Sequence, residues 1–294
     1  MEKYIDLHMH STCSDGTCSI EELIEQAKAL KLKAISITDH DNLNGYKRLN
    51  NLNSDIEIVK GVEIASTINK VPVEILCYGY DFEKMEKFMK DNCISHEEDS
   101  EIKVRRLKKI FNNLGINLNF DCDNFDYRDL SKWAISEIYE EIYQNQDALN
   151  LLKEENPEYL DGCKKFFRMG INNKNSKFFV DMSDVYMRID ILTNFAKENK
   201  FVTFLAHPYE YYENMVDVLN DAKSFVDGIE VYHPTANKES REFLEKFCRD
   251  NNLLISGGSD YHGRRGKLNS EQVPYSVLAN IKKRLIQLKN ENKY

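Results

Sequence analysis

The chain has 294 residues, a length that suits one α/β barrel carrying an insertion, and its 41% hydrophobic residues can form a sizeable core. The net charge of −9 argues against a broad basic surface that clamps nucleic acid, although it is compatible with a local basic pocket for a phosphate. No apolar run is long enough to cross a bilayer, the N-terminus has no signal-peptide core, and the seven cysteines include no CxxC pair. We therefore expect a cytoplasmic protein with reduced thiols and no membrane partner.

The first 80 residues alternate short apolar strands with one helix. A strand is expected over 4–7, followed by a polar loop over 8–18. Ser19 begins the sequence SIEE, a capping box in which Glu22 reaches back to the start of a helix that ends near Lys31. Further strands are expected over 34–38, 56–64 and 71–78.

Residues 81–199 have a mostly helical pattern instead. Helices are expected over 83–91, 96–114, 130–155, 158–168 and 182–199. Gly115 stands at a typical helix-stop position after the second of them, and His96 in that charged helix is expected at the solvated surface. This segment therefore reads as a helical insertion that caps the substrate site.

The strand and helix alternation returns after the insertion. Strands are expected over 201–206, 228–232 and 253–256, and helices over 214–222, 238–251 and 274–288. Alternating strands and helices predict a mostly parallel sheet or barrel. We expect residues 1–80 and 200–294 to form this catalytic part, with 81–199 as an insertion domain between its two halves.

Histidines recur where the predicted strands end. His8, His40, His207 and His233 each follow an apolar segment directly, and His262 comes shortly after the last strand. Catalytic residues of parallel α/β barrels lie at the C-terminal ends of the strands, so this repeated placement indicates one shared site.

Carboxylates share this placement, with Asp15 in the first loop, Glu63 at a strand end and Asp260 two residues before His262. Alternate residues of an extended segment point the same way, so such pairs can reach one site. The candidate metal ligands are His8, His10, Asp15, His40, Glu63, His207, Asp260 and His262. Mixed imidazole and carboxylate ligands suit Zn²⁺, Mn²⁺ or Fe, and this set is too large for one tetrahedral ion. Two or three divalent ions that share bridging carboxylates are therefore expected.

The same positions carry a family resemblance. The segments IDLHMHSTCSDGT, KGVEI, FLAHP, GIEVYHP and ISGGSDYHG resemble, in this order, the polymerase and histidinol phosphatase (PHP) family over most of 1–80 and 200–266. The resemblance implies a distorted (β/α)₇ TIM-like barrel with three metal ions. Within the family, the sequence is most similar to the bacterial group that removes phosphates from nucleotides, including 3′,5′-bisphosphates, and in some members trims RNA from the 5′ end.

Carried over by position, the resemblance distributes the ligands over three ions. His8, His10, Glu63 and Asp260 would serve the first ion, Asp15, His40 and His262 the second, and His207 with Glu63 the third. The family usually has histidine eleven residues after that glutamate, where this chain has Glu74. Glutamate would make the third site richer in oxygen and favour Mn²⁺ or Fe over Zn²⁺. The alternative is a two-ion site with Glu74 at the surface.

The expected reaction is hydrolysis of a phosphate monoester or diester, in which a water shared by two ions attacks phosphorus. The catalytic candidates are His207, His262 and Asp260, with either histidine as proton donor. The substrate-binding candidates are Arg105, Arg106, His233, Arg264 and Lys132. Lys132 would partly replace an Arg-Pro-His-like segment of nucleotide-cleaving relatives. For Arg105 and Arg106 an exposed helix face is the alternative.

Two alternative functions are also compatible with the sequence. One is a phosphatase for a small metabolite such as histidinol phosphate, in which the insertion closes the pocket. The other is a non-catalytic metal-binding PHP module, although such domains often lose ligands and this chain departs only at Glu74. The expected partner is a small phosphate ester or a short nucleic acid, and no obligate protein partner is inferred. Asp6, Asp39 and Asp41 are expected to orient imidazoles or to support the ligand loops.

Overall fold

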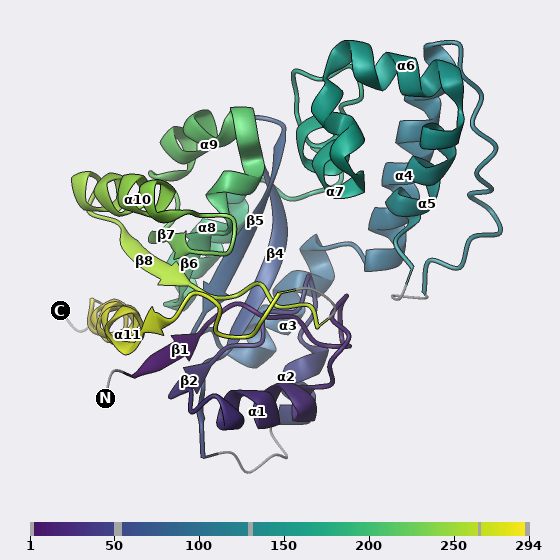
Figure 1. Ribbon diagram of the computed structural model, residues 1–294. Helices are drawn as coiled ribbons and strands as arrows, with labels where there is room; N and C mark the ends of the chain where they lie inside the picture. Colours follow the sequence, from purple (N-terminus) through teal and green to yellow (C-terminus); the bar gives the residue numbers. More distant parts are fainter. Residues whose placement is uncertain (1–2, 50–54, 129–131, 264–265, 292–294) are drawn as a thin grey trace.

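The computed structural model, described for residues 3–49, 55–128, 132–263 and 266–291, contains two β-sheets and a separate group of helices (Figure 1). The four-stranded sheet has the order β3 (Glu57–Ile58), β2 (Ala34–Ile35), β1 (Tyr4–Asp6) and β9 (Val273–Pro274). The five-stranded sheet has the order β4 (Gly61–Ile68), β5 (Val71–Tyr78), β6 (Val202–Leu205), β7 (Gly228–Tyr232) and β8 (Leu254–Gly257). The predicted α/β class is thereby confirmed.

Among the residues that the structure describes, strand pairing does not close these sheets into the expected continuous barrel. Isolated bridges join them, one between Met9 and Tyr261 and another between His40 and Glu63. The pairs β1–β2, β2–β3, β6–β7 and β7–β8 are parallel, whereas β4–β5, β5–β6 and β1–β9 are antiparallel. The expectation of a mostly parallel sheet is therefore only partly met.

A tight hairpin explains the antiparallel pairing of β4 with β5. Asn69 and Lys70 connect them with backbone φ angles of 47° and 71°, the left-handed geometry that two-residue hairpin turns require. The single strand predicted over 56–64 is wrong, because β3 and β4 belong to different sheets and the chain passes between them at 59–60.

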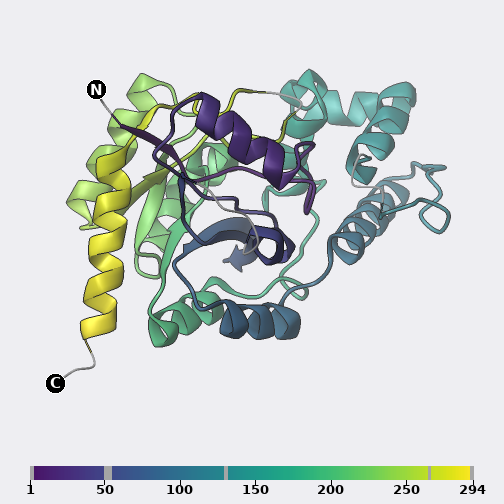
Figure 2. The same ribbon diagram turned by 90° about the horizontal axis from the view of Figure 1, so that it is seen from below.

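Helices cover the outer faces of the sheets. They are α1 (Ile20–Ala29), α2 (Asn44–Leu49), α9 (Met215–Ala222), α10 (Lys238–Asp250) and α11 (Tyr275–Asn290), together with the 3₁₀ segment η3 (Pro208–Asn214). The Ser19 capping box of α1 is confirmed, whereas α2 was not predicted. Val277 and Ile281 of α11 share one hydrophobic cluster with Ile5 of β1 and Phe204 of β6, so α11 ties the two sheets together (Figure 2).

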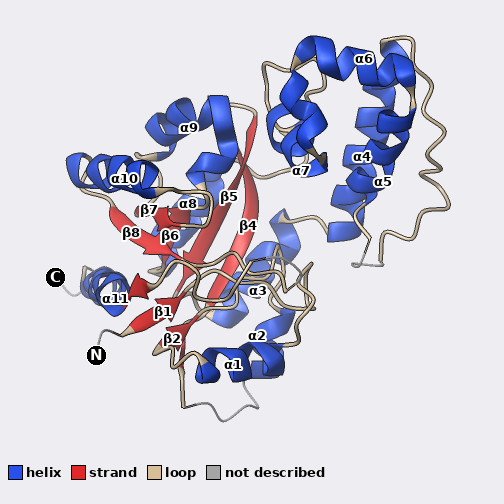
Figure 3. Ribbon diagram, viewed as in Figure 1, coloured by secondary structure: helices blue, strands red, loops and turns tan. Residues whose placement is uncertain are grey.

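The insertion consists of helices and loops and has its own hydrophobic core (Figure 3). Its elements are α4 (His96–Asn113), α5 (Ala134–Gln144), α6 (Gln146–Glu155), η1 (Pro157–Asp161), α7 (Cys163–Lys165) and the π-helical segment η2 (Phe166–Ile171). By contrast, α3 (Phe82–Asn92) and α8 (Ile189–Asn199) pack through Met85 and Leu192 into the core of the five-stranded sheet. This packing favours an insertion of about 94–186, shorter than the predicted 81–199.

Three predicted helices of the insertion differ from the structure. The helix over 130–155 is interrupted at Asn145, whose side chain caps α6. The helix over 158–168 is broken at Gly162, where φ is 134°. The helix over 182–199 begins only with α8, because the backbone of Thr67 and the hydroxyl of Ser66 both donate to the Met187 carbonyl and hold that segment against β4. Among the described residues, no helix combines the length and the apolar character needed to cross a membrane.

Candidate metal centre

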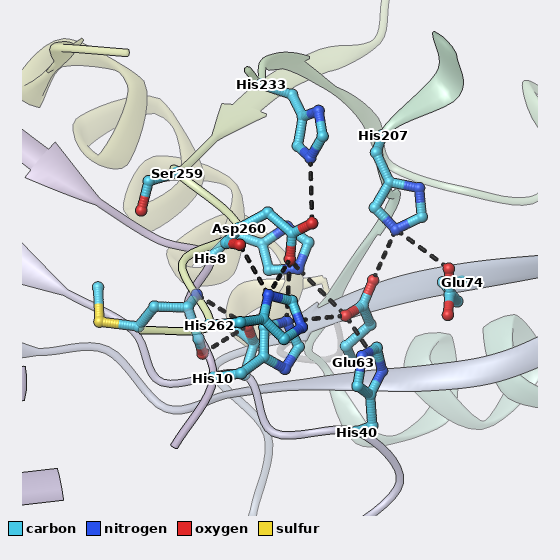
Figure 4. A network of polar contacts seen from close by, with 12 residues as sticks. His8, His10, His40, Glu63, Glu74, His207, His233, Ser259, Asp260 and His262 are labelled. Atoms are coloured by element: carbon cyan, nitrogen blue, oxygen red, sulfur yellow. Dashed lines mark hydrogen bonds and ion pairs between the residues drawn. The ribbon is translucent and has the colours of Figure 1, made fainter. Parts of the chain in front are cut away.

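The predicted metal ligands come from both sheets and converge on one cluster (Figure 4). His8 follows β1, Glu63 lies in β4, His207 follows β6 and Asp260 follows β8. The cluster contains His8, His10, Asp15, His40, Glu63, Glu74, His207, Asp260 and His262. The structure therefore brings together the whole predicted ligand set.

The most deeply buried group consists of His8, His10, Glu63 and Asp260. Oε2 of Glu63 lies 3.1 Å from Nε2 of His8 and 3.3 Å from Nε2 of His10. Oδ1 of Asp260 lies 3.3 Å and 3.2 Å from the same two nitrogens. Two imidazoles and two carboxylates that face one point form a donor set for one divalent cation.

A second, more exposed group lies beside the first one. Oδ2 of Asp15 is 3.2 Å from Nε2 of His262 and 3.9 Å from Nε2 of His40. The His10 ring stacks on the His40 ring and on the His262 ring, with centroid distances of 4.3 and 4.2 Å. His10 therefore belongs to both groups and links them.

A third group surrounds the other oxygen of Glu63. Nε2 of His207 lies 3.0 Å from Oε1 of Glu63 and 3.1 Å from Oε2 of Glu74. The Glu74 side chain is 22% exposed and faces the cluster, so its position differs from the alternative of a surface residue. A carboxylate in this place is consistent with its predicted role as a ligand.

The hydrogen-bond partners of the imidazoles in the cluster are compatible with cation binding. Both ring nitrogens of His10 are buried without a hydrogen-bond partner among the described residues. Nδ1 of His8 donates to Glu230 at 2.9 Å, and Nδ1 of His262 donates to the carbonyl of Asp260 at 2.8 Å. In each case the neutral ring with its proton on Nδ1 would direct the lone pair of Nε2 toward a cation in the cluster. The residues therefore fit a divalent metal centre.

The charges in the cluster shift the pKa values of its members strongly. Burial opposes ionisation of Glu63, but the neighbouring His8 and His40 lower the pKa of this carboxyl well below its usual range. Burial also opposes the charge of His10, yet the neighbouring carboxylates of Asp260 and Glu63 raise its pKa to about 10. Without a cation, the cluster therefore holds the ionised carboxylate of Glu63 beside the protonated imidazole of His10.

Backbone strain accompanies these side-chain positions. His207 and Asp260 have φ angles of 29° and 47°, in the left-handed region that non-glycine residues rarely adopt. Gly258 lies behind His8, and a Cβ atom there would come within 2.3 Å of the His8 backbone nitrogen. The strand ends are thus shaped to aim the ligand side chains inward.

The three aspartates that were predicted to support the site all accept hydrogen bonds from backbone N–H groups. Asp39 accepts from the Ser11 backbone N–H at 2.7 Å, and Asp6 accepts from that of Ser259 at 2.9 Å. Asp41 accepts from a backbone N–H of β4. These contacts stabilise the ligand loops rather than orienting imidazoles.

Glu230 is a supporting residue that the sequence analysis missed. Its Oε1 faces His8, and its Oε2 accepts from the backbone N–H of His207 at 2.8 Å. The side chain is fully buried. The sequence feature that could have indicated Glu230 is an acidic residue inside the apolar strand GIEVY.

Arg105 and Arg106 form ion pairs with other residues of the insertion. Arg105 pairs with Glu101 at 2.7 Å and with Asp123 at 2.5 Å. Arg106 pairs with Asp184 at 2.7 Å. Each guanidinium is therefore neutralised by carboxylates of the insertion, as expected for the alternative of a helix face with structural ion pairs.

The other predicted substrate-binding residues differ in position. Lys132 lies exposed in the insertion, and Arg264 lies outside the described residues. Nε2 of His233 is 3.4 Å from Oδ2 of Asp260, beside the cluster. Its Nδ1 accepts from the Thr235 backbone N–H at 3.2 Å, so the neutral ring carries its proton on Nε2. This arrangement suits hydrogen bonding to a substrate better than metal ligation.

Arg168 and Glu210 are two further residues that the sequence analysis did not select. Arg168 comes from η2 of the insertion and pairs with Glu74 and with Glu210. Glu210 lies in η3, three residues after His207, and is 2% exposed. A lone arginine in an irregular helix gave no recognisable pattern.

The chain belongs to the PHP domain family, whose model matches residues 6–293. It is accordingly a metal-dependent phosphoesterase, a hydrolase with a divalent metal centre. It is similar to a phosphoribosyl 1,2-cyclic phosphate 1,2-diphosphodiesterase from Eggerthella lenta, with 23% identity over 90% of this chain and 95% of the relative. A 5′-3′ exoribonuclease from Haemophilus influenzae is 25% identical over 89% of this chain and 91% of the relative.

Two solved structures have a similar fold. One is an amidohydrolase from Chromobacterium violaceum, with a TM-score of 0.64. The other, from Bifidobacterium adolescentis, is provisionally described as a metal-dependent phosphoesterase and gives a TM-score of 0.60. Each is 20% identical to this chain, and each match covers 96% of both chains.

Proposed function

We propose that this enzyme hydrolyses phosphate esters of nucleotides, including bisphosphates, and that short RNA with a 5′ phosphate is a further substrate. The observation that carries the proposal is the convergence of nine imidazole and carboxylate side chains on one cluster. The names of the relatives, a cyclic phosphate diphosphodiesterase and an exoribonuclease, support a substrate built on a phosphorylated sugar. The complete ligand set also argues against a non-catalytic module.

Different residues of the cluster would bind the cations and the substrate. The first and second groups would hold two cations, and Glu63, Glu74 and His207 a third; Mn²⁺, Fe²⁺ and Zn²⁺ all suit this donor set. Bound cations would supply an acidified water and positive charge for the transition state. His233 presents its Nε2–H beside Asp260 and can donate to a phosphate oxygen.

A cavity beside the cluster favours a large leaving group. It has a volume of about 430 Å³, and His40 lies in its wall. Leu43 and Met89 give it apolar surface, and Asn44 and Lys90 give it polar groups. Ligand pockets of this size commonly hold drug-sized molecules, so the volume supports a nucleoside as the leaving group.

The test is phosphate release from a substrate panel. Adenosine 3′,5′-bisphosphate, AMP, histidinol phosphate, a generic aryl phosphate and a 5′-phosphorylated RNA oligomer would each be supplied with Mn²⁺, Fe²⁺ or Zn²⁺. We expect selective turnover of the bisphosphate or the RNA, lost in the His8→Ala variant. Turnover of histidinol phosphate alone would replace the nucleotide assignment by that of a metabolite phosphatase. No turnover of any ester by a metal-loaded protein would favour the non-catalytic module.

A further inference from the structure

A line of alternating charges connects the insertion to the metal centre. It begins at Lys164 of α7, whose Nζ lies 2.5 Å from Oε1 of Glu210. Oε2 of Glu210 is 2.8 Å from Nη2 of Arg168, and Nη1 of Arg168 is 2.9 Å from Oε2 of Glu74. Oε2 of Glu74 in turn lies 3.1 Å from Nε2 of His207. The insertion therefore contacts the third ligand group through the Arg168 guanidinium.

The position of Glu74 needs such a cation. Its carboxylate lies in a group that already contains Glu63, so two negative charges face the same imidazole of His207. Like charges in a buried site repel strongly unless a positive group stands beside them. Arg168 supplies such a positive group, because its Nη1 lies 2.9 Å from Oε2 of Glu74.

Arg168 is well placed to fix one orientation of this carboxylate. Its side chain is only 12% exposed, and its two terminal nitrogens are divided between Glu74 on one side and Glu210 on the other. A planar guanidinium held at both ends has little freedom to rotate. It comes from the π-helical η2, and irregular turns of this kind often mark functional positions.

We propose that Arg168 is a positioning residue that holds the Glu74 carboxylate beside His207 and so completes the third ligand group from within the insertion. The inference rests on the metal centre proposed above. It makes docking of the insertion a condition for full metal loading. A neutral ligand in place of Glu74 would need no such partner.

The test is Mn²⁺ binding by equilibrium dialysis and elemental analysis, combined with kcat and KM on the best substrate of the panel. In the Arg168→Met variant we expect loss of one ion per chain, or a drop in its affinity of about 10- to 100-fold, the usual effect of removing a residue that orients a ligand. The rate constant kcat should fall with it while KM stays nearly constant. The double variant Glu74→His with Arg168→Met should recover the ion and most of kcat, because histidine is a neutral ligand.

Arg106→Met is the matched control, since it removes an ion-paired arginine of the insertion that contacts Asp184 instead of Glu74. It should keep the wild-type metal content. Thermal unfolding of each variant shows whether the chain is folded. Unchanged metal content and affinity in Arg168→Met would overturn the inference, as would a rise in KM alone, which would make Arg168 a substrate contact. Wild-type protein that binds only two ions would also overturn it, and failure to bind any would overturn the proposed function itself.

Discussion

Nδ1 of His8 lies 2.9 Å from Oε1 of Glu230, so this buried imidazole donates from Nδ1 and keeps its Nε2 lone pair for the metal cluster. The same carboxylate accepts from the His207 backbone, which links two ligands from different strands. One acidic side chain thereby sets the tautomer of one ligand and the backbone position of another.

The Glu230→Gln substitution should therefore weaken metal binding without removing a ligand. An amide oxygen is a weaker acceptor than a carboxylate, and we expect a loss of about 10- to 100-fold in metal affinity. Isothermal titration with Mn²⁺ measures this loss. Glu239→Gln, at the exposed start of α10, serves as the control. Equal affinities of the Glu230→Gln variant and the wild type would show that the contact does not orient His8.

Substitution of Gly258 by alanine should disrupt the centre through packing alone. The added Cβ would lie within 2.3 Å of the His8 backbone nitrogen, so the end of β1 would have to move. Overpacking of this kind costs about 1–3 kcal/mol of unfolding free energy, and a displaced ligand should also lower activity. Urea unfolding and phosphate release measure the two effects. The neighbouring Ser259→Ala variant adds no atoms and should remain close to the wild type.

The Glu210 carboxylate gives a pH-dependent contribution to stability. Burial opposes its ionisation, but Arg168, His207 and Lys164 outweigh this effect and lower its pKa to about 2. A folded-state pKa below the ordinary value of about 4.3 stabilises the protein above that pH, and this contribution is lost as the pH falls toward 2. The wild type should thus exceed Glu210→Gln in unfolding free energy at pH 6, with a smaller difference at pH 3.

Chelator-treated protein unfolded in urea at both pH values provides this comparison. A difference that is constant or larger at pH 3 would show that the carboxylate is not held in its ionised form by these partners.

Metal removal should destabilise the folded chain. A cation that binds only the folded state stabilises it by about 2.7 kcal/mol at a free concentration of one hundred times Kd. Addition of Mn²⁺ to chelator-treated protein should therefore raise Tm, and His10→Ala should reduce the response because His10 borders two ligand groups. A Tm that is independent of Mn²⁺ in the wild type would contradict the fit of this cluster to divalent cations.

Substitution of Lys90 tests whether the substrate occupies the proposed leaving-group cavity. It lies in the cavity wall and has no ion-pair partner among the residues that the structure describes. If it binds an anionic part of the substrate, Lys90→Gln should raise KM for the bisphosphate about tenfold, the equivalent of one charge-assisted hydrogen bond. Lys87→Gln, on the same helix but outside the cavity wall, is the control. Equal KM values for both variants would place the substrate elsewhere.

The sequence predicted which side chains converge on the cluster, because strand ends carry a clear signal. Histidine directly after an apolar run points to one edge of a sheet whatever the details of strand pairing, so His8, His40 and His207 could be found without coordinates. Glu63 lies inside β4 and not at the predicted strand end. The pairing itself was less predictable. The Asn69–Lys70 turn reverses the chain with two ordinary polar residues rather than the glycine typical of such turns.

The positive side chains of the site could not be predicted in the same way. Arg105 and Arg106 stand out in the sequence as a basic pair, yet carboxylates distant along the chain engage them in the fold. Arg168 has no such neighbour, and its contact with Glu74 spans 94 residues between η2 and β5. Contacts of this kind depend on how the insertion docks, which local patterns do not encode.

The metal cluster lies at the seam between the two sheets, close to the Met9–Tyr261 and His40–Glu63 bridges. His8, His10 and His40 come from the side of the four-stranded sheet, and Glu63, His207 and Asp260 from the five-stranded one. A cation held between them would bind side chains from both halves and so join the two sheets. Hydrogen exchange at the seam should therefore slow on metal binding, while exchange within the core of the insertion stays the same.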